Sequence, residues 1–245
     1  MLKNKIYKLI KILISLNYDW YRALLLYRVA ASTEHISVFN RIKNIHTIID
    51  VGSNRGQFAL SANNFFPDSR IICFEPLKSA FHCLEQVFKY KTNLTLFNFA
   101  VGNDVKDIEI NISNKEDSSS ILKITQKQET IFPGTEKISA EIVKLTTLQK
   151  IIQSEDLNND VLMKIDVQGY ELEVLHGSKS ILSKLKYIYV ESSFVEFYKE
   201  QPKISDILSF LLINNFKLDG VYNMSYDKNG DPVQADFLFL NCDYD

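Results

Sequence analysis

The chain has 245 residues, of which 46% are hydrophobic and 24% charged, with a formal net charge of −2. This length and apolar content allow one α/β domain with a full core and exclude disorder on a large scale. The nearly balanced charge gives no broad basic surface, so we expect no nucleic-acid partner, and a small molecule or a glycan is the favoured ligand.

Residues 1–45 are expected to form a mostly helical preface to a single domain over residues 46–245. Near the start, apolar side chains recur on one helical face with lysines elsewhere, and no uncharged run approaches the ~18 residues of a membrane span. We expect this helix to pack on the domain. Peripheral contact with the inner face of a membrane stays open as the alternative for a cytoplasmic protein. The face consists of Ile6, Leu9, Ile10, Leu13 and Ile14.

Residues 48–60 pass without a spacer from an apolar strand through a glycine turn into a helical pattern. In such a turn, Gly52 supplies a backbone angle that a side chain would forbid, and Gly56 allows close approach of the helix. A second strand then delivers Glu75 about 25 positions after Asp50, near the spacing at which nucleotide folds bind ribose hydroxyls. The Gly52-x-x-x-Gly56 spacing disfavours a dinucleotide, and no phosphate-loop lysine follows. The pattern therefore predicts a nucleoside cofactor without pyrophosphate, such as S-adenosylmethionine.

The elements that follow alternate between strands and helices. Helical periodicity over residues 58–66 and 77–88 and a third strand over residues 94–100 predict a parallel, doubly wound sheet. Isoleucines then alternate with polar residues over 108–112, and apolar with polar residues over 138–142, which indicates an extra antiparallel strand pair at the sheet edge. Residues 115–134 between them are expected to be a loop, either a linker or a lid.

Strand and helix patterns resume after residue 146. We expect a short helix over 147–153, a buried strand over 161–165, a helix over 170–182, a strand over 187–190, a helix through 204–211 and strands near 216–221 and 235–240. Asp166 and Glu191 follow two of these strands. Together with Asp50 and Glu75 they are expected to meet at the carboxyl edge of the sheet, where open parallel sheets bind ligands.

Several of these segments, in this order, resemble the FkbM family of S-adenosylmethionine-dependent methyltransferases. They are Ile49 to Phe58 (IDVGSNRGQF), Phe74-Glu75-Pro76, Ala100-Val101-Gly102, the serines ending at Ser120, Lys164 to Glu171 (KIDVQGYE), and Ala235 to Phe239 (ADFLF). The segment Ala31 to His35 is also similar to the preface of some members, with much less specificity.

The resemblance implies a class I methyltransferase fold of Rossmann-like type, with seven strands and the last one antiparallel and inserted between its neighbours. It also implies methyl transfer to a hydroxyl of a sugar, glycan or natural-product acceptor. The implied cofactor site comprises Asp50, Gly52, Ser53, Asn54, Gly56, Gln57 and Phe58 at the methionine and ribose, Glu75 and Pro76 at the ribose hydroxyls, Ala100 at the adenine and Ser120 at the mouth.

An alcohol acceptor needs a base. Asp166 is the first candidate, Glu191 the second and His35 the third, if the preface folds over the pocket. Two carboxylates without a histidine partner are a weak basis for a metal ion, so we predict none. The alternatives of another class are a nucleoside-binding protein without catalysis and a membrane-associated scaffold.

Lys164 lies in an otherwise apolar strand that should be buried on both faces. An unpaired ammonium there would cost several kcal/mol, so it needs a carboxylate partner. The strand order that the resemblance implies places this strand beside the one ending in Asp50. We therefore predict that the Lys164 nitrogen lies within ~4 Å of a carboxylate oxygen, first of Asp50 and second of Glu191.

Overall fold

The computed structural model describes residues 18–158 and 160–244. The helix expected near the start of the preface, and with it the question of membrane contact, falls outside these residues. Among the described residues, no helix has the length and apolar character needed to cross a membrane. The helices are α2 (Tyr18–Tyr27), α3 (Ile36–Arg41), α4 (Gln57–Phe65), α5 (Lys78–Phe88), α6 (Gln126–Ile131), α7 (Leu148–Ile151), α8 (Glu171–His176) and α9 (Ile204–Ile213). The strands are β1 (Thr47–Val51), β2 (Arg70–Phe74), β3 (Leu94–Phe97), β4 (Ala100–Val101), β5 (Lys106–Ser113), β6 (Lys137–Thr146), β7 (Val161–Ile165), β8 (Leu185–Ser193), β9 (Phe216–Tyr226) and β10 (Pro232–Asn241).

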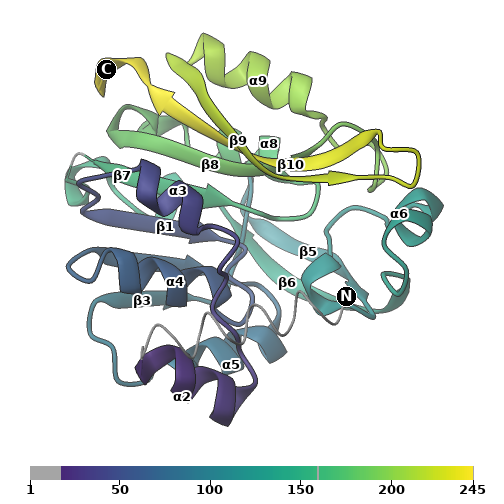
Figure 1. Ribbon diagram of the computed structural model, residues 1–245, viewed down its shortest axis with the longest axis horizontal. Helices are drawn as coiled ribbons and strands as arrows, with labels where there is room; N and C mark the ends of the chain where they lie inside the picture. Colours follow the sequence, from purple (N-terminus) through teal and green to yellow (C-terminus); the bar gives the residue numbers. More distant parts are fainter. Residues whose placement is uncertain (1–17, 159, 245) are drawn as a thin grey trace.

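Seven strands form the central sheet in the order β3-β2-β1-β7-β8-β10-β9 (Figure 1). The five strands from β3 to β8 are parallel, and β10 is antiparallel to both of its neighbours. The class I methyltransferase fold and the inserted last strand are therefore confirmed. Because β1 lies between β2 and β7, the turns that follow these three strands meet at one edge of the sheet.

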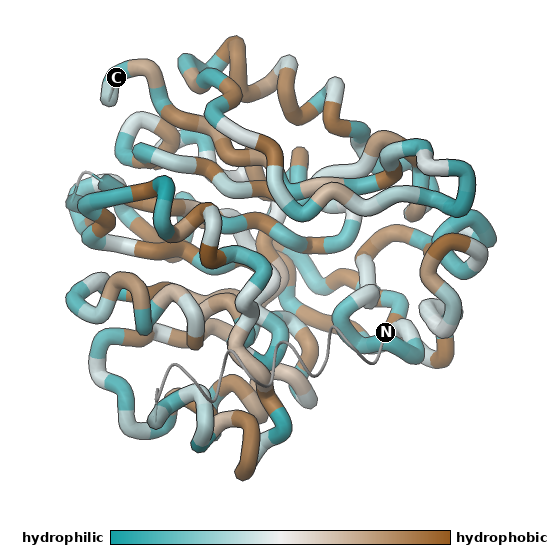
Figure 2. Tube along the Cα trace, viewed as in Figure 1, coloured by the Kyte–Doolittle hydropathy of each residue, from teal (hydrophilic) through white to brown (hydrophobic). Residues whose placement is uncertain are grey.

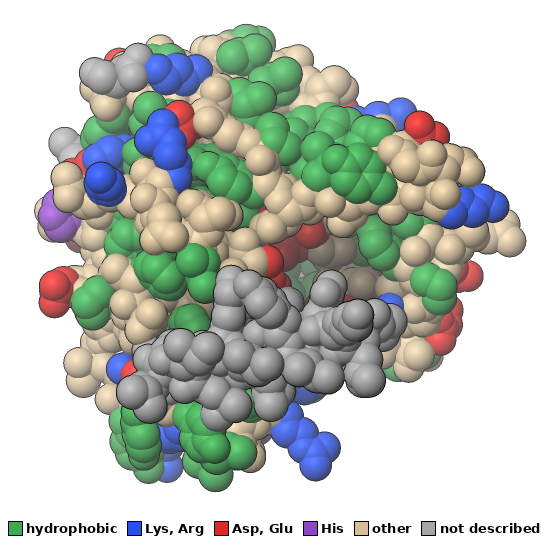
Figure 3. Space-filling model, viewed as in Figure 1, with side chains coloured by type: hydrophobic (Ala, Val, Ile, Leu, Met, Phe, Trp, Pro, Cys, Tyr) green, Lys and Arg blue, Asp and Glu red, His purple; other side chains and the backbone are tan. Residues whose placement is uncertain are grey.

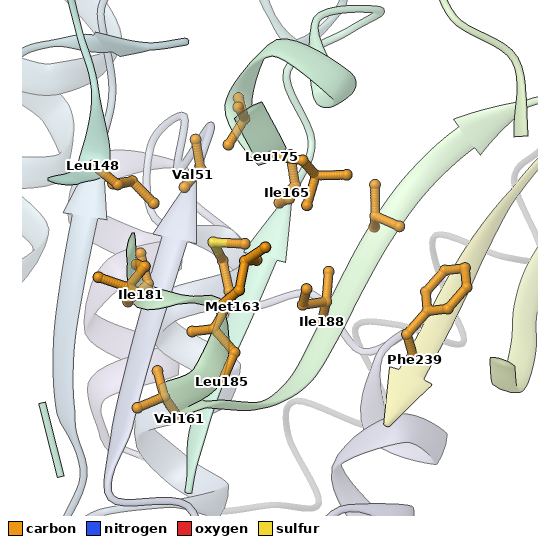
Figure 4. Packing of buried hydrophobic residues seen from close by; sticks show 14 of the residues in the cluster. Val51, Leu148, Val161, Met163, Ile165, Leu175, Ile181, Leu185, Ile188 and Phe239 are labelled. Atoms are coloured by element: carbon orange, nitrogen blue, oxygen red, sulfur yellow. The ribbon is translucent and has the colours of Figure 1, made fainter. Parts of the chain in front are cut away.

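The sheet is covered on both faces, and successive residues of β1 face opposite layers. Ile48 packs with side chains from α2 to α5, whereas Ile49 packs with those of α7, α8 and α9. Figure 2 shows the hydrophobic stretches along the central strands, with hydrophilic turns at the periphery. Figure 4 shows the second layer, in which Met163 of β7 lies beside Ile188, its partner in β8. This burial on both faces explains the continuous apolar strands.

A second sheet has the order β4-β6-β5, with β5 antiparallel to β6. It confirms the expected antiparallel pair. The single strand expected over residues 94–100 is wrong, because β3 ends at Phe97 and the chain turns into β4 of the other sheet. Asn98 stabilises this turn by donating from Nδ2 to the main-chain oxygens of Glu75 and Pro76, both at 2.9 Å.

Residues 115–134 also differ from expectation. They contain a short 3₁₀ helix, Glu116–Ser118, and α6, whose first turn Thr125 caps by accepting from the Gln128 N–H at 3.3 Å. The helix expected over 170–182 ends at His176. A Cβ on Gly177 would lie 1.9 Å from the Gly102 oxygen, and this close crossing of two backbones turns the chain. The helical periodicity of apolar residues in the sequence does not reveal such a tertiary contact.

Residues 18–45 pack against the helices of one face. The Trp20 indole donates to the Leu60 oxygen at 3.0 Å, and Ser61 Oγ donates to the Ser32 oxygen at 2.6 Å. The Ser32 N–H donates in turn to the Gln57 oxygen at 3.0 Å. These bonds hold the segment just before α3 against α4, which brings His35 to the carboxyl edge of the sheet.

Candidate active site

A cavity of about 250 Å³ opens at the carboxyl edge of the central sheet. The turns after β1, β2 and β7, the strand β4 and residues 116–121 surround it, and Figure 3 shows acidic side chains at a hollow on this face. The structure brings eleven of the predicted site residues to its lining: His35, Gly52, Ser53, Asn54, Gln57, Phe58, Glu75, Pro76, Ala100, Ser120 and Asp166.

Three predicted site residues do not line the cavity. Asp50 is fully buried, and it is followed by Val51 before β1 ends. Gly56 is the N-cap of α4, and a Cβ there would lie 2.6 Å from Phe88 of α5, so this glycine permits helix packing. Glu191 lies inside β8 rather than at a strand end, and Gln168 contacts its carboxylate. The assumption that all four acids terminate strands is therefore wrong for Asp50 and Glu191.

The turn after β1 is held between its two neighbouring strands. The N–H groups of Gly52 and Ser53 both donate to the Phe74 oxygen at 3.0 Å. Gly52 has φ +84°, and a Cβ on it would lie 1.9 Å from the Asp166 oxygen. Both the backbone angle and the contact require glycine. The main chain of this turn therefore packs directly against the main chain of Phe74 and of Asp166. We call this turn the cradle.

Glu75 is the acid next to this turn. Its two oxygens accept from the Asn54 and Leu77 N–H groups, each at 2.8 Å. Burial raises the pKa of Glu75 to about 7, against these two hydrogen bonds, which lower it. Each carboxylate oxygen can accept a further hydrogen bond, so Glu75 can also receive hydroxyls from a ligand in the cavity.

The predicted partner of Lys164 is confirmed. Its ammonium lies 3.7 Å from Asp50 Oδ1, and it lies closer still, at 3.2 Å, to Asp166 Oδ2, which we did not predict. Burial opposes the charge of Lys164, but Asp166 and Asp50 outweigh it and raise the pKa of Lys164. Neither Asp50 oxygen has a hydrogen bond to any residue that the structure describes, so Lys164 provides the compensation for this buried acid. Burial nonetheless raises the pKa of Asp50.

Gln168 joins the two remaining acids. Its Nε2 donates to Asp166 Oδ1 at 2.7 Å and to Glu191 Oε2 at 2.8 Å, and its Oε1 accepts from the Tyr198 hydroxyl at 2.6 Å. Burial and then Asp166 raise the pKa of Glu191 well above its usual range. Burial also opposes the charge of Asp166, but Lys164 and Gln168 outweigh it and lower the pKa. Of these two acids, Glu191 therefore keeps its proton and Asp166 is ionised.

His35 connects the cavity to a buried polar group behind it that sequence reasoning missed. Its Nδ1 lies 2.9 Å from the Tyr189 hydroxyl, which donates to Asp236 Oδ2 at 2.8 Å. Asn223 Nδ2 also donates to Asp236, at 2.7 Å. A signal was present, because Asp236 is a charge in an apolar strand, the same feature that identified Lys164.

A family model for the methyltransferase FkbM domain matches residues 50–218. The chain belongs to the FkbM methyltransferase family. A curated relative, the 2-O-methyltransferase NoeI of Sinorhizobium fredii, is 30% identical in an alignment of 176 positions that covers 67% of this chain and 70% of the relative. This FkbM methyltransferase is therefore an S-adenosylmethionine-dependent enzyme, and the non-catalytic alternatives are dropped.

Two solved structures are similar to this FkbM methyltransferase. Sp1610 of Streptococcus pneumoniae, in complex with S-adenosyl-L-methionine, matches with a TM-score of 0.50 and 9% identity, over 86% of this chain and 73% of that one. TrmK of M. capricolum, with S-adenosyl-homocysteine, matches with a TM-score of 0.47 and 9% identity, over 86% and 68%.

The residues of the cavity in this FkbM methyltransferase fit that cofactor. S-adenosylmethionine presents a ribose diol, an ammonium and a sulfonium, which call for hydrogen-bond acceptors and negative charge. Gln57 lines the cavity with a buried Oε1 that has no hydrogen-bond partner among the described residues. Glu75 and the ionised Asp166 add acceptors. At Gly52, the main chain of the turn after β1 lies against the main chain of Asp166, which brings both turns to the cavity.

Proposed function

We propose that this enzyme methylates a hydroxyl oxygen of a sugar, glycan or natural-product acceptor. The observation that carries the proposal is that a carboxylate and an imidazole, those of Asp166 and His35, line one cavity beside the cofactor cradle and can accept hydrogen bonds there. A hydroxyl must lose its proton during methylation, so such groups have a use there. The relative named a 2-O-methyltransferase supports the same chemistry.

The charge of the cavity favours an uncharged polyol. Of the described residues that line it, five are acidic and one is a lysine; the acids are Glu34, Glu75, Glu116, Asp117 and Asp166. Because Lys164 is already paired with Asp166, phosphate or carboxylate groups on an acceptor would meet a lining with more carboxylates than cations. This argues against nucleic acid and for a sugar or a related polyol.

We infer a separate task for each of several residues of the chain. Glu75 would accept hydrogen bonds from the ribose hydroxyls, and Gln57 Oε1 would accept one from a donor group of the cofactor. Asn54, Phe58, Pro76 and Ala100 would surround the cofactor. The bound cofactor supplies a methyl group activated by its sulfonium. Asp166, fixed by Lys164 and Gln168, would accept a hydrogen bond from the acceptor hydroxyl and align it at ~3 to 3.5 Å from the methyl carbon.

The proposal is tested with purified enzyme, S-adenosylmethionine and a panel of methyl glycosides that differ in which hydroxyl is free. We expect release of S-adenosylhomocysteine that depends on one hydroxyl position. Transfer RNA and a lysine-rich peptide serve as competing acceptors. Methylation of either of these, with every glycoside inert, would contradict the proposal.

Glu75→Ala is expected to weaken S-adenosylmethionine binding by about tenfold or more, because a charge-assisted hydrogen bond contributes roughly 1.5 to 3 kcal/mol. Since burial raises the pKa of Glu75 to about 7, the free protein must lose a proton below that pH to bind the ribose. The affinity of the wild type should therefore decrease as the pH falls below about 7. Titration calorimetry between pH 5.5 and 8.5 measures both effects.

Glu109→Ala is the matched control, because Glu109 is an exposed acid of β5 that does not line the cavity. It should leave the affinity and its pH dependence unchanged. If Glu75→Ala bound the cofactor as tightly as this control does, Glu75 would have no place in the site.

A further inference from the structure

We propose that His35, held by Tyr189 and Asp236, is the base that takes the proton of the acceptor hydroxyl, while Asp166 only orients that hydroxyl. The inference rests on the proposed function, since it assigns a catalytic role at the same site. It moves the role of base from our first candidate to our third.

The hydrogen bonds around Tyr189 fix the tautomer of His35. Tyr189 has one hydroxyl proton and donates it to Asp236 Oδ2 at 2.8 Å. Its oxygen must therefore accept from its other neighbours, which are Asn223 Nδ2 at 3.3 Å and His35 Nδ1 at 2.9 Å. A neutral imidazole has one N–H, and here it lies on Nδ1. The lone pair is consequently on Nε2.

Nε2 is the nitrogen left for the acceptor. His35 lines the cavity, and within the described part of the chain Nε2 makes no hydrogen bond. The ring contacts Phe58 edge to face, with centroids 5.2 Å apart, and the Lys164 ammonium lies 5.5 Å from the centroid of the same Phe58 ring. His35 therefore stands at the same end of the cavity as the Lys164 and Asp166 pair.

The charges around His35 suit a base that is neutral before the reaction. Burial lowers the pKa of His35, with Asp236, Glu34 and Asp166 opposing this effect and Lys164 adding to it. The imidazole is thus unprotonated at neutral pH. Burial raises the pKa of Asp236, but His35, Asn223 and Tyr189 oppose this effect. Once His35 has gained a proton, the Asp236 oxygen, 3.7 Å from Nδ1, lies close enough to compensate the new charge.

The two carboxylates are less suited to the task. Asp166 is ionised, but Lys164 and Gln168 occupy its oxygens and lower its pKa, which makes it a poor proton acceptor. Glu191 does not line the cavity, and its raised pKa keeps it protonated. An acid that holds its proton cannot act as the base.

In the proposed step, the acceptor O–H bond breaks and its proton forms a bond with Nε2. The electron pair left on oxygen forms the bond to the methyl carbon, and the pair of the broken carbon–sulfur bond stays on sulfur. The products are a methyl ether, S-adenosylhomocysteine and an imidazolium at His35. The imidazolium then releases its proton to solvent.

The tautomer can be measured without any acceptor. Long-range ¹H–¹⁵N correlation spectra of the full chain with S-adenosylhomocysteine should show His35 protonated on Nδ1 and bare on Nε2 at pH 7.5. The spectrum of His35→Asn assigns the signal among the four histidines. A proton on Nε2 in the neutral state would overturn the proposal, whatever the acceptor proves to be.

The kinetic test uses His35→Asn, whose amide can still donate to Tyr189 but has no group at the Nε2 position. With the best methyl glycoside of the panel, kcat should fall by about 100-fold or more while cofactor affinity is unchanged. His82→Asn, at an exposed histidine, is the control and should retain full turnover. A His35→Asn variant within threefold of the wild type would refute the assignment.

The pH profile separates a base from a structural residue. The acid limb of kcat/KM should follow the His35 titration, and Asp236→Asn should move it to lower pH, because Asp236 raises the pKa of His35. An acid limb at the same pH in Asp236→Asn and in the wild type would contradict the role of Asp236 and His35 in taking the proton. If no glycoside is turned over while the tautomer is as expected, the sugar acceptor is refuted and the geometry of His35 is not.

Discussion

Gly52→Ala is expected to lower turnover by about 100-fold or more and to destabilise the fold by about 3 kcal/mol. Two costs add at this position. The positive φ costs a side chain about 1 to 2 kcal/mol, and the new Cβ would lie 1.9 Å from the Asp166 oxygen. The turns after β1 and β7 would have to separate, which displaces the cradle from the residues at the reacting centre.

Gly230→Ala isolates the first of these costs. Gly230 has φ +87°, and a Cβ on it would have no neighbour within 4 Å. This control should lose about 1 to 2 kcal/mol in chemical denaturation and keep its full methyl transfer. Equal losses of stability and activity in the two variants would show that the close contact between Gly52 and Asp166 affects neither folding nor turnover.

Lys164→Met is expected to lower the free energy of unfolding by about 3 kcal/mol at pH 8, because it leaves buried acids without a cation. Asp50 is fully buried, and within residues 18–158 and 160–244 neither of its oxygens has a hydrogen-bond partner. In the variant, its folded-state pKa should rise further above the unfolded value. The folded state then binds a proton that the unfolded chain releases, so the loss of stability should be smaller at pH 5 than at pH 8.

Denaturant unfolding at the two pH values measures this effect, with Lys186→Met as the control. Lys186 lies 2.6 Å from Asp160, but both side chains of this pair are partly exposed, so its loss should cost about 1 kcal/mol or less at either pH. Adding Asp50→Asn to Lys164→Met should restore part of the stability. A pH-independent loss would show that Asp50 and Asp166 do not depend on Lys164.

Much of the fold could be predicted because the strands are buried on both faces. The continuous apolar runs at β1, β2 and β7 and the glycine turn after β1 are local signals, and they place the cradle correctly. Lys164 is a charge in an apolar strand and must find a partner, and the strand order that the resemblance implies then indicated Asp50.

The errors arise where distant contacts decide the outcome. The end of α8 depends on Gly177 crossing Gly102, and the break after β3 depends on Asn98 bonding to the turn after β2. Neither partner is near in sequence. Tyr189 was missed because an aromatic residue in an apolar strand is normally part of the core, and only the structure places its hydroxyl between His35 and Asp236.

The central claim, methyl transfer to a hydroxyl, is tested most directly with S-adenosylmethionine labelled with ¹³C in its methyl group. After reaction with a glycoside of the panel, heteronuclear correlation NMR identifies the atom that carries the label. We predict a methyl ether, with the labelled carbon correlated to a single ring proton of the sugar. A label on nitrogen or carbon, or a label found only in RNA or protein, would contradict the account.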